Sequence, residues 1–260
     1  MTITKYIILD IICGIIYSLP ISPNGTINIL HNTFNTNVFK QPTYYYNIIK
    51  LGIVISILLI FKSEIKKNIN LNKKTIKNNS KYLLYIILST IIPLPLLTSN
   101  FYKSLFKKKL TLHLIAIFFL INSLLLIYNN KNNNKDRKVN LKDAIMIGIS
   151  SIFNIIPGSC QLINLLTISK LRKLSKKQAL NISISIYTTT IIINTILSLN
   201  FFKENILILT IGIFVTTLFS YYTLNYFIKL YNKNKLSKLS LYFIITSIFI
   251  LIWFRDLLTN

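Results

Sequence analysis

Long apolar runs recur along the whole of this 260-residue chain and constrain its fold more than any other feature. A helix needs roughly 20 mainly apolar residues to cross the hydrocarbon core of a bilayer, and only helices satisfy lipid-exposed backbone in such runs. Charged residues make up 14% of the chain, against about 25% in a soluble domain. We therefore predict an all-α integral membrane protein, a single polytopic domain over residues 1–260. Its full spans are expected near 47–61, 82–98, 110–128, 179–202, 205–228 and 239–259.

Basic residues gather in the short links between these runs and give the chain a net charge of +24. The links lack the aromatic interleaving and the recognisable modules of nucleic-acid binding proteins, so we predict no nucleic-acid partner. Lys and Arg in short loops mark the cytoplasmic side of a membrane protein instead. The main basic links are 62–81, 131–142, 170–177 and 229–238.

Two further apolar segments, about 6–34 and 144–169, are interrupted by Pro, Gly and Asn. If both are re-entrant, the four main basic links share one side, with 21 Lys and Arg against 9 on the other. This distribution predicts cytoplasmic basic loops and both termini outside. If 144–169 crosses the membrane instead, the bias nearly vanishes. The basic link 103–109 does not fit the rule.

The N-terminus resembles a signal peptide, because an apolar run follows Lys5. Asp10 interrupts that run and no small-residue cleavage site follows, so we expect the segment to stay as the first membrane element. The abundance of Lys, Asn and Ile is typical of an AT-rich genome. We therefore predict a multi-pass protein of a bacterial inner (plasma) membrane.

The two interrupted segments occupy matching positions, and each is followed by three full spans. This pattern predicts inverted repeats, about 1–128 and 141–260, with a binding site where the broken segments meet. Gly25 and Gly158 would let the backbone turn and expose N–H groups to a phosphate beside the following helix N-termini. The alternative is a pair of kinked helices whose small residues allow close packing. The polar residues that would add neutral hydrogen bonds to a ligand are Ser22, Asn24, Thr26, Ser159 and Gln161.

Several short stretches, in order, carry a resemblance to a known family. They are Gly14-x-x-x-x-Leu19-Pro20-Ile21-Ser22-x-x-Gly25, Leu51-Gly52, Ile92-Pro93, Lys103-Ser104-Leu105-Phe106, and Ala144-Ile-Met-Ile-Gly148 leading to Pro157-Gly158. Together they resemble the BacA/UppP family of bacterial undecaprenyl-diphosphate phosphatases over most of the chain. The resemblance implies six transmembrane helices plus two re-entrant helix pairs in an inverted repeat. It also implies a hydrolase that releases one phosphate from undecaprenyl diphosphate at the outer face, regenerating the lipid carrier of peptidoglycan synthesis.

The family's reactive groups are replaced in this sequence. Its two glutamates fall on Cys13 and Tyr17, its histidine on Thr26, and its Ser-Arg-Ser on Cys160, Gln161 and Leu162. The motif positions kept from the family are Ser22, Gly25, Pro157 and Gly158. Gln cannot supply the charged fork of Arg, and neither Cys nor Tyr replaces a carboxylate as a ligand for a hard cation such as Mg²⁺. We assign no metal ligand, and Mg or Ca would be needed only if the protein is active.

Asp10 is the candidate catalytic residue that remains. At helical spacing it shares a face with Cys13 and Tyr17, and an acid within a membrane segment is a candidate for function. The alternative is an interfacial position. His31 is expected in an interfacial loop and His113 near the start of a span. Cys13 and Cys160 are expected to be small buried residues, although a thiolate or a disulfide stays open.

Three hypotheses follow for the function. The first is a polyprenyl-diphosphate phosphatase with a displaced set of reactive groups. The second is a catalytically inactive relative that binds or translocates the lipid carrier. The third is a small transporter, which shares the architecture. The expected partners are membrane lipids and a polyprenyl diphosphate. The sequence leaves open the length of the lipid, the formation of a homo-oligomer and the presence of peptidoglycan in the host.

Overall fold

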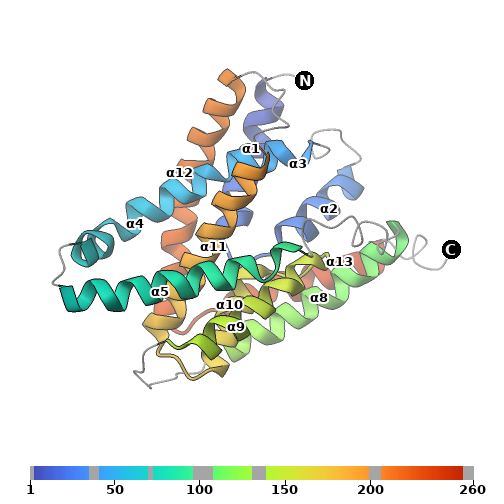
Figure 1. Cartoon of the computed structure of the whole chain (residues 1–260). Coiled ribbons are helices and arrows are strands. Elements are labelled where there is room, and N and C mark those ends of the chain that lie inside the picture. Colours follow the sequence, from blue (N-terminus) through green and yellow to red (C-terminus); the bar gives the residue numbers. More distant parts are fainter. Residues whose placement is uncertain are drawn as a thin grey trace.

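The computed structural model describes residues 3–34, 41–69, 73–95, 108–130, 139–198 and 206–253, and every element assigned there is a helix (Figure 1). The first half contains α1 (Ile3–Ser18), α2 (Pro23–Phe34), α3 (Thr43–Ile49), α4 (Leu51–Ile69), α5 (Lys73–Ile91) and α8 (Lys108–Tyr128). The second half contains α9 (Leu141–Ser150), the 3-10 helix η2 (Ser151–Ile155), α10 (Gln161–Leu171), α11 (Lys176–Ser198), α12 (Ile206–Asn232) and α13 (Ser237–Trp253). The all-α prediction is confirmed.

Helix length and hydropathy agree with a membrane protein. Within the described residues, three helices are long and apolar enough to cross a bilayer: Thr43–Ser63, Lys176–Ser198 and Ile206–Asn232. Shorter apolar helical stretches are Ser80–Ile91, Leu112–Tyr128 and Ser237–Trp253. Large apolar side chains also cover the outer surface, and Leu124, Tyr222 and Ile252 are each exposed by more than 65%. Lipid is the solvent that such a surface requires.

Each of the six predicted spans coincides with a helix, and both interrupted segments are broken near the expected positions. The predicted link 62–81 was wrong as a loop, since α4 continues to Ile69 and α5 already begins at Lys73. Residues 96–98, 199–202 and 254–259, predicted to end three spans, lie outside the described residues, as do 131–138 and most of the link 103–109. The number of crossings, the re-entrant pairs and the sidedness of the loops stay predictions.

Small and hydroxyl-bearing residues join the helices to one another. Ser56 of α4 shares a hydrogen bond of 2.6 Å with Ser220 of α12, and Ser89 of α5 donates to the carbonyl of Ala144 in α9 at 2.7 Å. Ser247 of α13 donates to the carbonyl of Ala116 in α8 at 3.0 Å. In lipid, helices associate through close packing and such bonds rather than through the hydrophobic effect. The polar residues of the spans therefore act as interhelical contacts.

The two halves of the chain are interleaved rather than packed side by side (Figure 1). In the packing, α1 lies against α12 and α9 against α5, while α4 contacts α12 and α11 contacts α5. If α1 is exchanged with α9, α4 with α11, and α5 with α12, the α1–α12 contact becomes the α9–α5 contact. The α4–α12 contact likewise becomes the α11–α5 contact. The contacts of α8 with α13 and of α4 with α11 are unchanged by the exchange. This is the pattern expected of two related repeats, which themselves stay a prediction.

Gly52 sets the distance between α4 and α12. A Cβ at Gly52 would lie 2.7 Å from the Ile213 carbonyl oxygen and 2.8 Å from the Thr217 nitrogen, both backbone atoms that cannot move alone. At Gly14 the nearest atom to a Cβ would be a side-chain carbon of Phe219 at 3.0 Å. The requirement for glycine is therefore stricter at Gly52.

We predict that Gly52→Ala destabilises the protein by about 1–3 kcal/mol, because overpacking forces α4 away from α12. The comparison variant Gly14→Ala should lose less stability than Gly52→Ala. Thermal unfolding of the two purified variants and the parent in detergent checks the order. Equal melting temperatures for all three would contradict the close packing of α4 on α12.

Candidate functional site

The two breaks in the helices meet each other in the middle of the protein. The first break, residues 19–22, joins α1 to α2, and the second, 156–160, joins η2 to α10. The thiol of Cys160 donates to the carbonyl of Ile21 at 3.3 Å. A Cβ on Gly25 would lie 3.1 Å from the Cα of Gly158, so the two backbones are in contact. The segments that the sequence singled out are therefore neighbours in space.

Side chains from other helices bind the carbonyl groups that the breaks release. The hydroxyl of Tyr187 on α11 donates to the carbonyl of Tyr17 at 2.7 Å, and the amide of Asn122 on α8 donates to the carbonyl of Gly158 at 2.7 Å. Asn122 is 1% exposed. A broken helix at membrane depth is tolerated only where such partners replace the lost backbone bonds. The breaks are thus a supported part of the fold.

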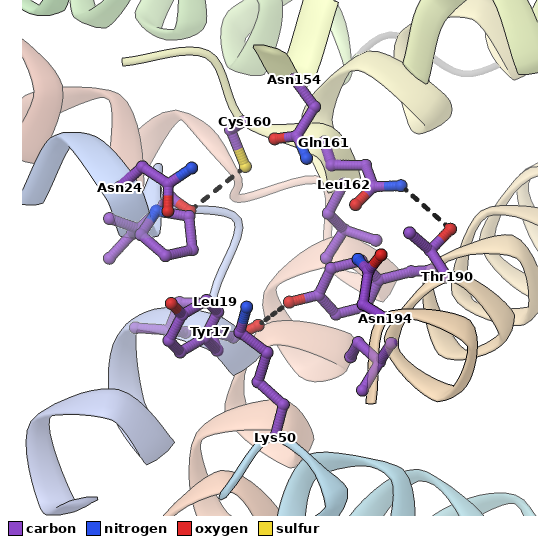
Figure 2. A pocket seen from close by; sticks show the side chains of 14 residues that line it. Tyr17, Leu19, Asn24, Lys50, Asn154, Cys160, Gln161, Leu162, Thr190 and Asn194 are labelled. Carbon is purple, nitrogen blue, oxygen red and sulfur yellow. Dashed lines mark hydrogen bonds between the residues drawn. The ribbon is translucent and has the colours of Figure 1, made fainter. Parts of the chain in front are cut away.

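An inner cavity of about 70 Å³ lies at this junction (Figure 2). It is lined by both breaks, by Lys50 and by one face of α11, which carries Tyr187, Thr190 and Asn194. Gln161 donates to the hydroxyl of Thr190 at 3.3 Å and so joins the second break to α11. The lining combines apolar side chains with a small set of converging polar groups, which is typical of a binding site.

Among the described residues that line the inner cavity, Lys50 is the one charged side chain. It follows the end of α3, and its Nζ lies 4.5 Å from the centre of the Tyr17 ring and donates to Asn47 Oδ1 at 3.1 Å. Figure 2 shows it reaching toward Tyr17 and Asn24. No acidic side chain lines the cavity within the described residues, so the ammonium charge is available to an anion.

Three amide side chains around the cavity are also available to a ligand. Asn24, Asn154 and Asn194 line it, and their side chains make no hydrogen bond to the described residues. Each amide offers two donors and one acceptor. Together with Lys50 they form a neutral-to-positive lining that suits phosphate oxygens.

An outer cleft of about 390 Å³ continues from the inner cavity. Tyr17, Asn24 and Lys50 line both spaces and connect them. The rest of the cleft lies between α2, which contributes Asn28 and His31 among others, and residues 41–46 before and within α3. Its size falls in the range of ligand pockets, about 300–1,000 Å³.

Comparison with known proteins identifies the family. A model of the family described as Bacitracin resistance protein BacA matches residues 6–249. The chain belongs to this family. A protein named undecaprenyl-diphosphatase from Wigglesworthia glossinidia brevipalpis is 30% identical over 228 residues, which cover 82% of this chain and 85% of the relative. Another undecaprenyl-diphosphatase, from Pelagibacter ubique, is 28% identical over 96% of this chain and 97% of its own length. Undecaprenyl-diphosphatase 1 of Bacillus licheniformis is 23% identical over 97% and 98%.

The structure divides the residues predicted to bind substrate into two groups. Asn24 and Gln161 line the inner cavity, together with Tyr17 and Cys160 from the positions where the BacA-family resemblance places reactive groups. The others that we predicted lie outside the lining of both spaces: Ser22, Gly25, Thr26, Pro157, Gly158 and Ser159, with Cys13.

The residues of the second group make contacts within the protein. The hydroxyl of Ser22 accepts from the Gly25 N–H at 3.3 Å, and Thr26 shares a hydrogen bond of 2.9 Å with the hydroxyl of Tyr242. Ser159 accepts from the amide of Asn164 at 2.9 Å. Their contacts hold the two breaks in place beside the cavity.

The two motif glycines differ in their role. Gly158 has a φ of +92°, as expected of a residue that turns the chain before α10. The same expectation was wrong for Gly25, which lies in the first turn of α2. A Cβ there would lie 2.8 Å from the ring of Phe119, so glycine is required by close approach. His31 was also predicted in a loop, and it lies in the last turn of α2 instead.

Asp10 shares the buried face of α1 with Cys13 and Tyr17, as predicted, but it lines neither the cavity nor the cleft. Its carboxyl is enclosed by α3 and α12: Tyr45 donates to Oδ1 at 2.8 Å, and Oδ2 is the atom that a Cβ on Gly212 would approach to 3.0 Å. A catalytic role for Asp10 stays a hypothesis, and its position indicates a contact that joins α1 to α3.

The next question is whether the described residues form a disulfide or could hold a metal ion. Cys13 and Cys160 are both free thiols and both buried. Across the described ranges, no three His, Cys, Asp or Glu side chains are grouped so as to hold a metal ion. The charge that lines the cavity is a lysine, which repels a divalent cation. The donor set therefore does not fit Mg or Ca.

The sequence analysis missed Lys50, Tyr187, Thr190 and Asn194. Lys50 lies within the predicted span 47–61 and was counted only as one of the nine Lys and Arg on the outer side. The three residues of α11 recur at spacings of three and four, which places them on one face of a helix. This stripe of polar residues within an apolar span could have predicted that α11 lines a polar cavity.

We predict that Tyr45→Phe destabilises the protein by about 1–3 kcal/mol, because it leaves the buried Asp10 carboxyl without its hydrogen-bond donor. Asp10→Asn keeps an acceptor for the Tyr45 hydroxyl and should change stability far less. Thermal unfolding in detergent measures both. A larger loss of stability in Asp10→Asn than in Tyr45→Phe would argue that the carboxylate itself stabilises the fold.

Proposed function

We propose that this chain binds the diphosphate head group of a polyprenyl diphosphate in the inner cavity, with Lys50 as the counter-charge. The observation that carries the proposal is the Lys50 ammonium group at the junction of both broken segments, in a cavity that no acidic side chain of the described residues lines. The names of the BacA-family relatives, undecaprenyl-diphosphatases, supply the class of ligand.

The chemistry of the lining supports an anionic head group. A lysine is a compact point charge that binds phosphate, and away from bulk water its attraction for an anion is stronger than at the surface. The amides of Asn24, Asn154 and Asn194, which make no hydrogen bond to the described residues, add neutral donors around it. The apolar polyprenyl tail stays in the lipid phase, so head-group contacts determine the specificity.

The residues that line the cavity favour binding of the diphosphate without its efficient hydrolysis. Diphosphate hydrolysis needs a base or nucleophile as well as positive charge, and the inner cavity is lined by neither carboxylate nor histidine among the described residues. Hydrolysis is the second candidate function. One observation favours it: His31 lines the outer cleft together with Lys50, which would place an imidazole near a bound head group.

The predicted topology is part of this proposal. Two re-entrant pairs, α1 with α2 and α9 with α10, would open the site to the outer face of a bacterial inner membrane. The basic ends of α10 and α12 would face the cytoplasm, and both termini would lie outside. The outer cleft lies beside α2, whose last turn would then approach the outer surface.

We predict that Lys50→Gln weakens binding of undecaprenyl diphosphate roughly ten- to a hundredfold, the worth of a hydrogen bond to a charged group. Lys50→Arg should retain most of the affinity. The matched control is Lys62→Gln, which removes an exposed lysine of α4. Binding is measured with protein in lipid nanodiscs at two salt concentrations. Equal affinity in Lys50→Gln and Lys62→Gln would refute the proposal.

Phosphate release separates binding from hydrolysis. We expect little release from undecaprenyl diphosphate, with or without added Mg²⁺ or Ca²⁺, beside an active family member run in parallel. If release occurs and is lost in His31→Gln, the chemistry has moved to the outer cleft. If it is lost in Asp10→Asn at unchanged stability, Asp10 acts in catalysis.

A further inference from the structure

The outer cleft is larger than the inner cavity, and its lining differs in kind. Asn24, Asn28 and Asn32 recur every four residues on α2 and so present their amides along one face of that helix toward the cleft. Across the cleft, Gln41, Thr43 and Tyr46 add further neutral polar groups. A space lined in this way favours a ligand rich in neutral hydrogen-bonding groups.

The hydrogen bonds on α2 leave one donor and one acceptor of residues that line the cleft without a partner among the described residues. Asn32 Nδ2 donates to Asn28 Oδ1 at 2.6 Å and to the Asn28 carbonyl at 2.8 Å. These bonds fix both amides one turn apart. Within the part of the chain that the structure describes, Asn28 Nδ2 and Asn32 Oδ1 have no partner. A fixed donor beside a fixed acceptor matches a pair of neighbouring hydroxyl groups, each of which both donates and accepts.

Other classes of ligand fit the outer cleft less well. A metal ion or an organic cation would need acidic groups, and none lines the cleft among the described residues. A polyprenyl tail already has the lipid phase, and Ile27 is the one aliphatic side chain among the described residues that line the cleft. A longer chain of phosphates would need more positive charge than Lys50 supplies, the one basic Lys or Arg side chain among the described residues of the cleft. Neutral hydroxyl or amide groups of a sugar meet none of these objections.

We propose that the outer cleft binds a sugar carried on the distal phosphate, so that the ligand is a glycosylated polyprenyl diphosphate rather than the free diphosphate. Tyr17, Asn24 and Lys50 line both spaces, so the inference places the distal phosphate of a diphosphate held at Lys50 at the entrance to the cleft. This inference rests on the proposed function, since it takes Lys50 as the site of the diphosphate.

The test compares two lipids on the same protein in nanodiscs. Undecaprenyl diphosphate and undecaprenyl diphosphate carrying one N-acetylglucosamine are the probes, and dissociation constants are measured for both. We expect the sugar to tighten binding about tenfold, the effect of one or two neutral hydrogen bonds in a site away from bulk water. The double variant Asn28→Leu/Asn32→Leu should lose this gain.

Two controls keep a loss of binding from being mistaken for misfolding. The affinity of the double variant for undecaprenyl diphosphate itself should stay unchanged, because neither residue lines the inner cavity. Asn225→Leu makes the same chemical change at an exposed position of α12 and should keep the gain from the sugar. Equal affinity of the parent for both lipids overturns the inference and leaves the proposed function standing. Binding of neither lipid overturns both.

Discussion

The hydrocarbon core of a bilayer offers no hydrogen-bond partner to a peptide group, and the arrangement of this protein depends on that constraint. Two interrupted helices have to place their freed carbonyls against donors from the protein. Cys160, Tyr187 and Asn122 supply those donors from three different segments. Because the two breaks are brought together for this reason, polar groups converge where the surrounding protein is apolar. The cavity is a consequence of how the broken helices are satisfied.

Much of the fold could be predicted from the sequence, because apolar runs in a membrane protein report helix positions directly. The turn at Gly158 was also predictable, because a positive φ favours glycine. Gly25 was misjudged because close approach to Phe119 depends on tertiary packing, which local sequence does not encode. Lys50 was missed because a lone lysine beside an apolar run has the same pattern as a topology-setting charge. Its place in the cavity depends on how α3 meets the breaks.

The resemblance to the BacA family predicts reactive groups at several positions, and the structure shows which of these residues line the cavity. Tyr17, Cys160 and Gln161 line the cavity without charge, and the positive group comes from Lys50 on another segment. A cavity with its own ammonium group can attract an anion without a metal ion that acidic side chains would have to hold.

The interleaving of the two halves affects the order in which the protein can be made. Helix α1 emerges from the ribosome first, yet its main neighbour α12 follows nearly 190 residues later. At about 5–20 residues per second, that separation corresponds to roughly 10–40 seconds of translation. During this interval the Asp10 carboxyl lacks the cover of α12. Helix α1 therefore reaches its final packing only after α12 has been inserted.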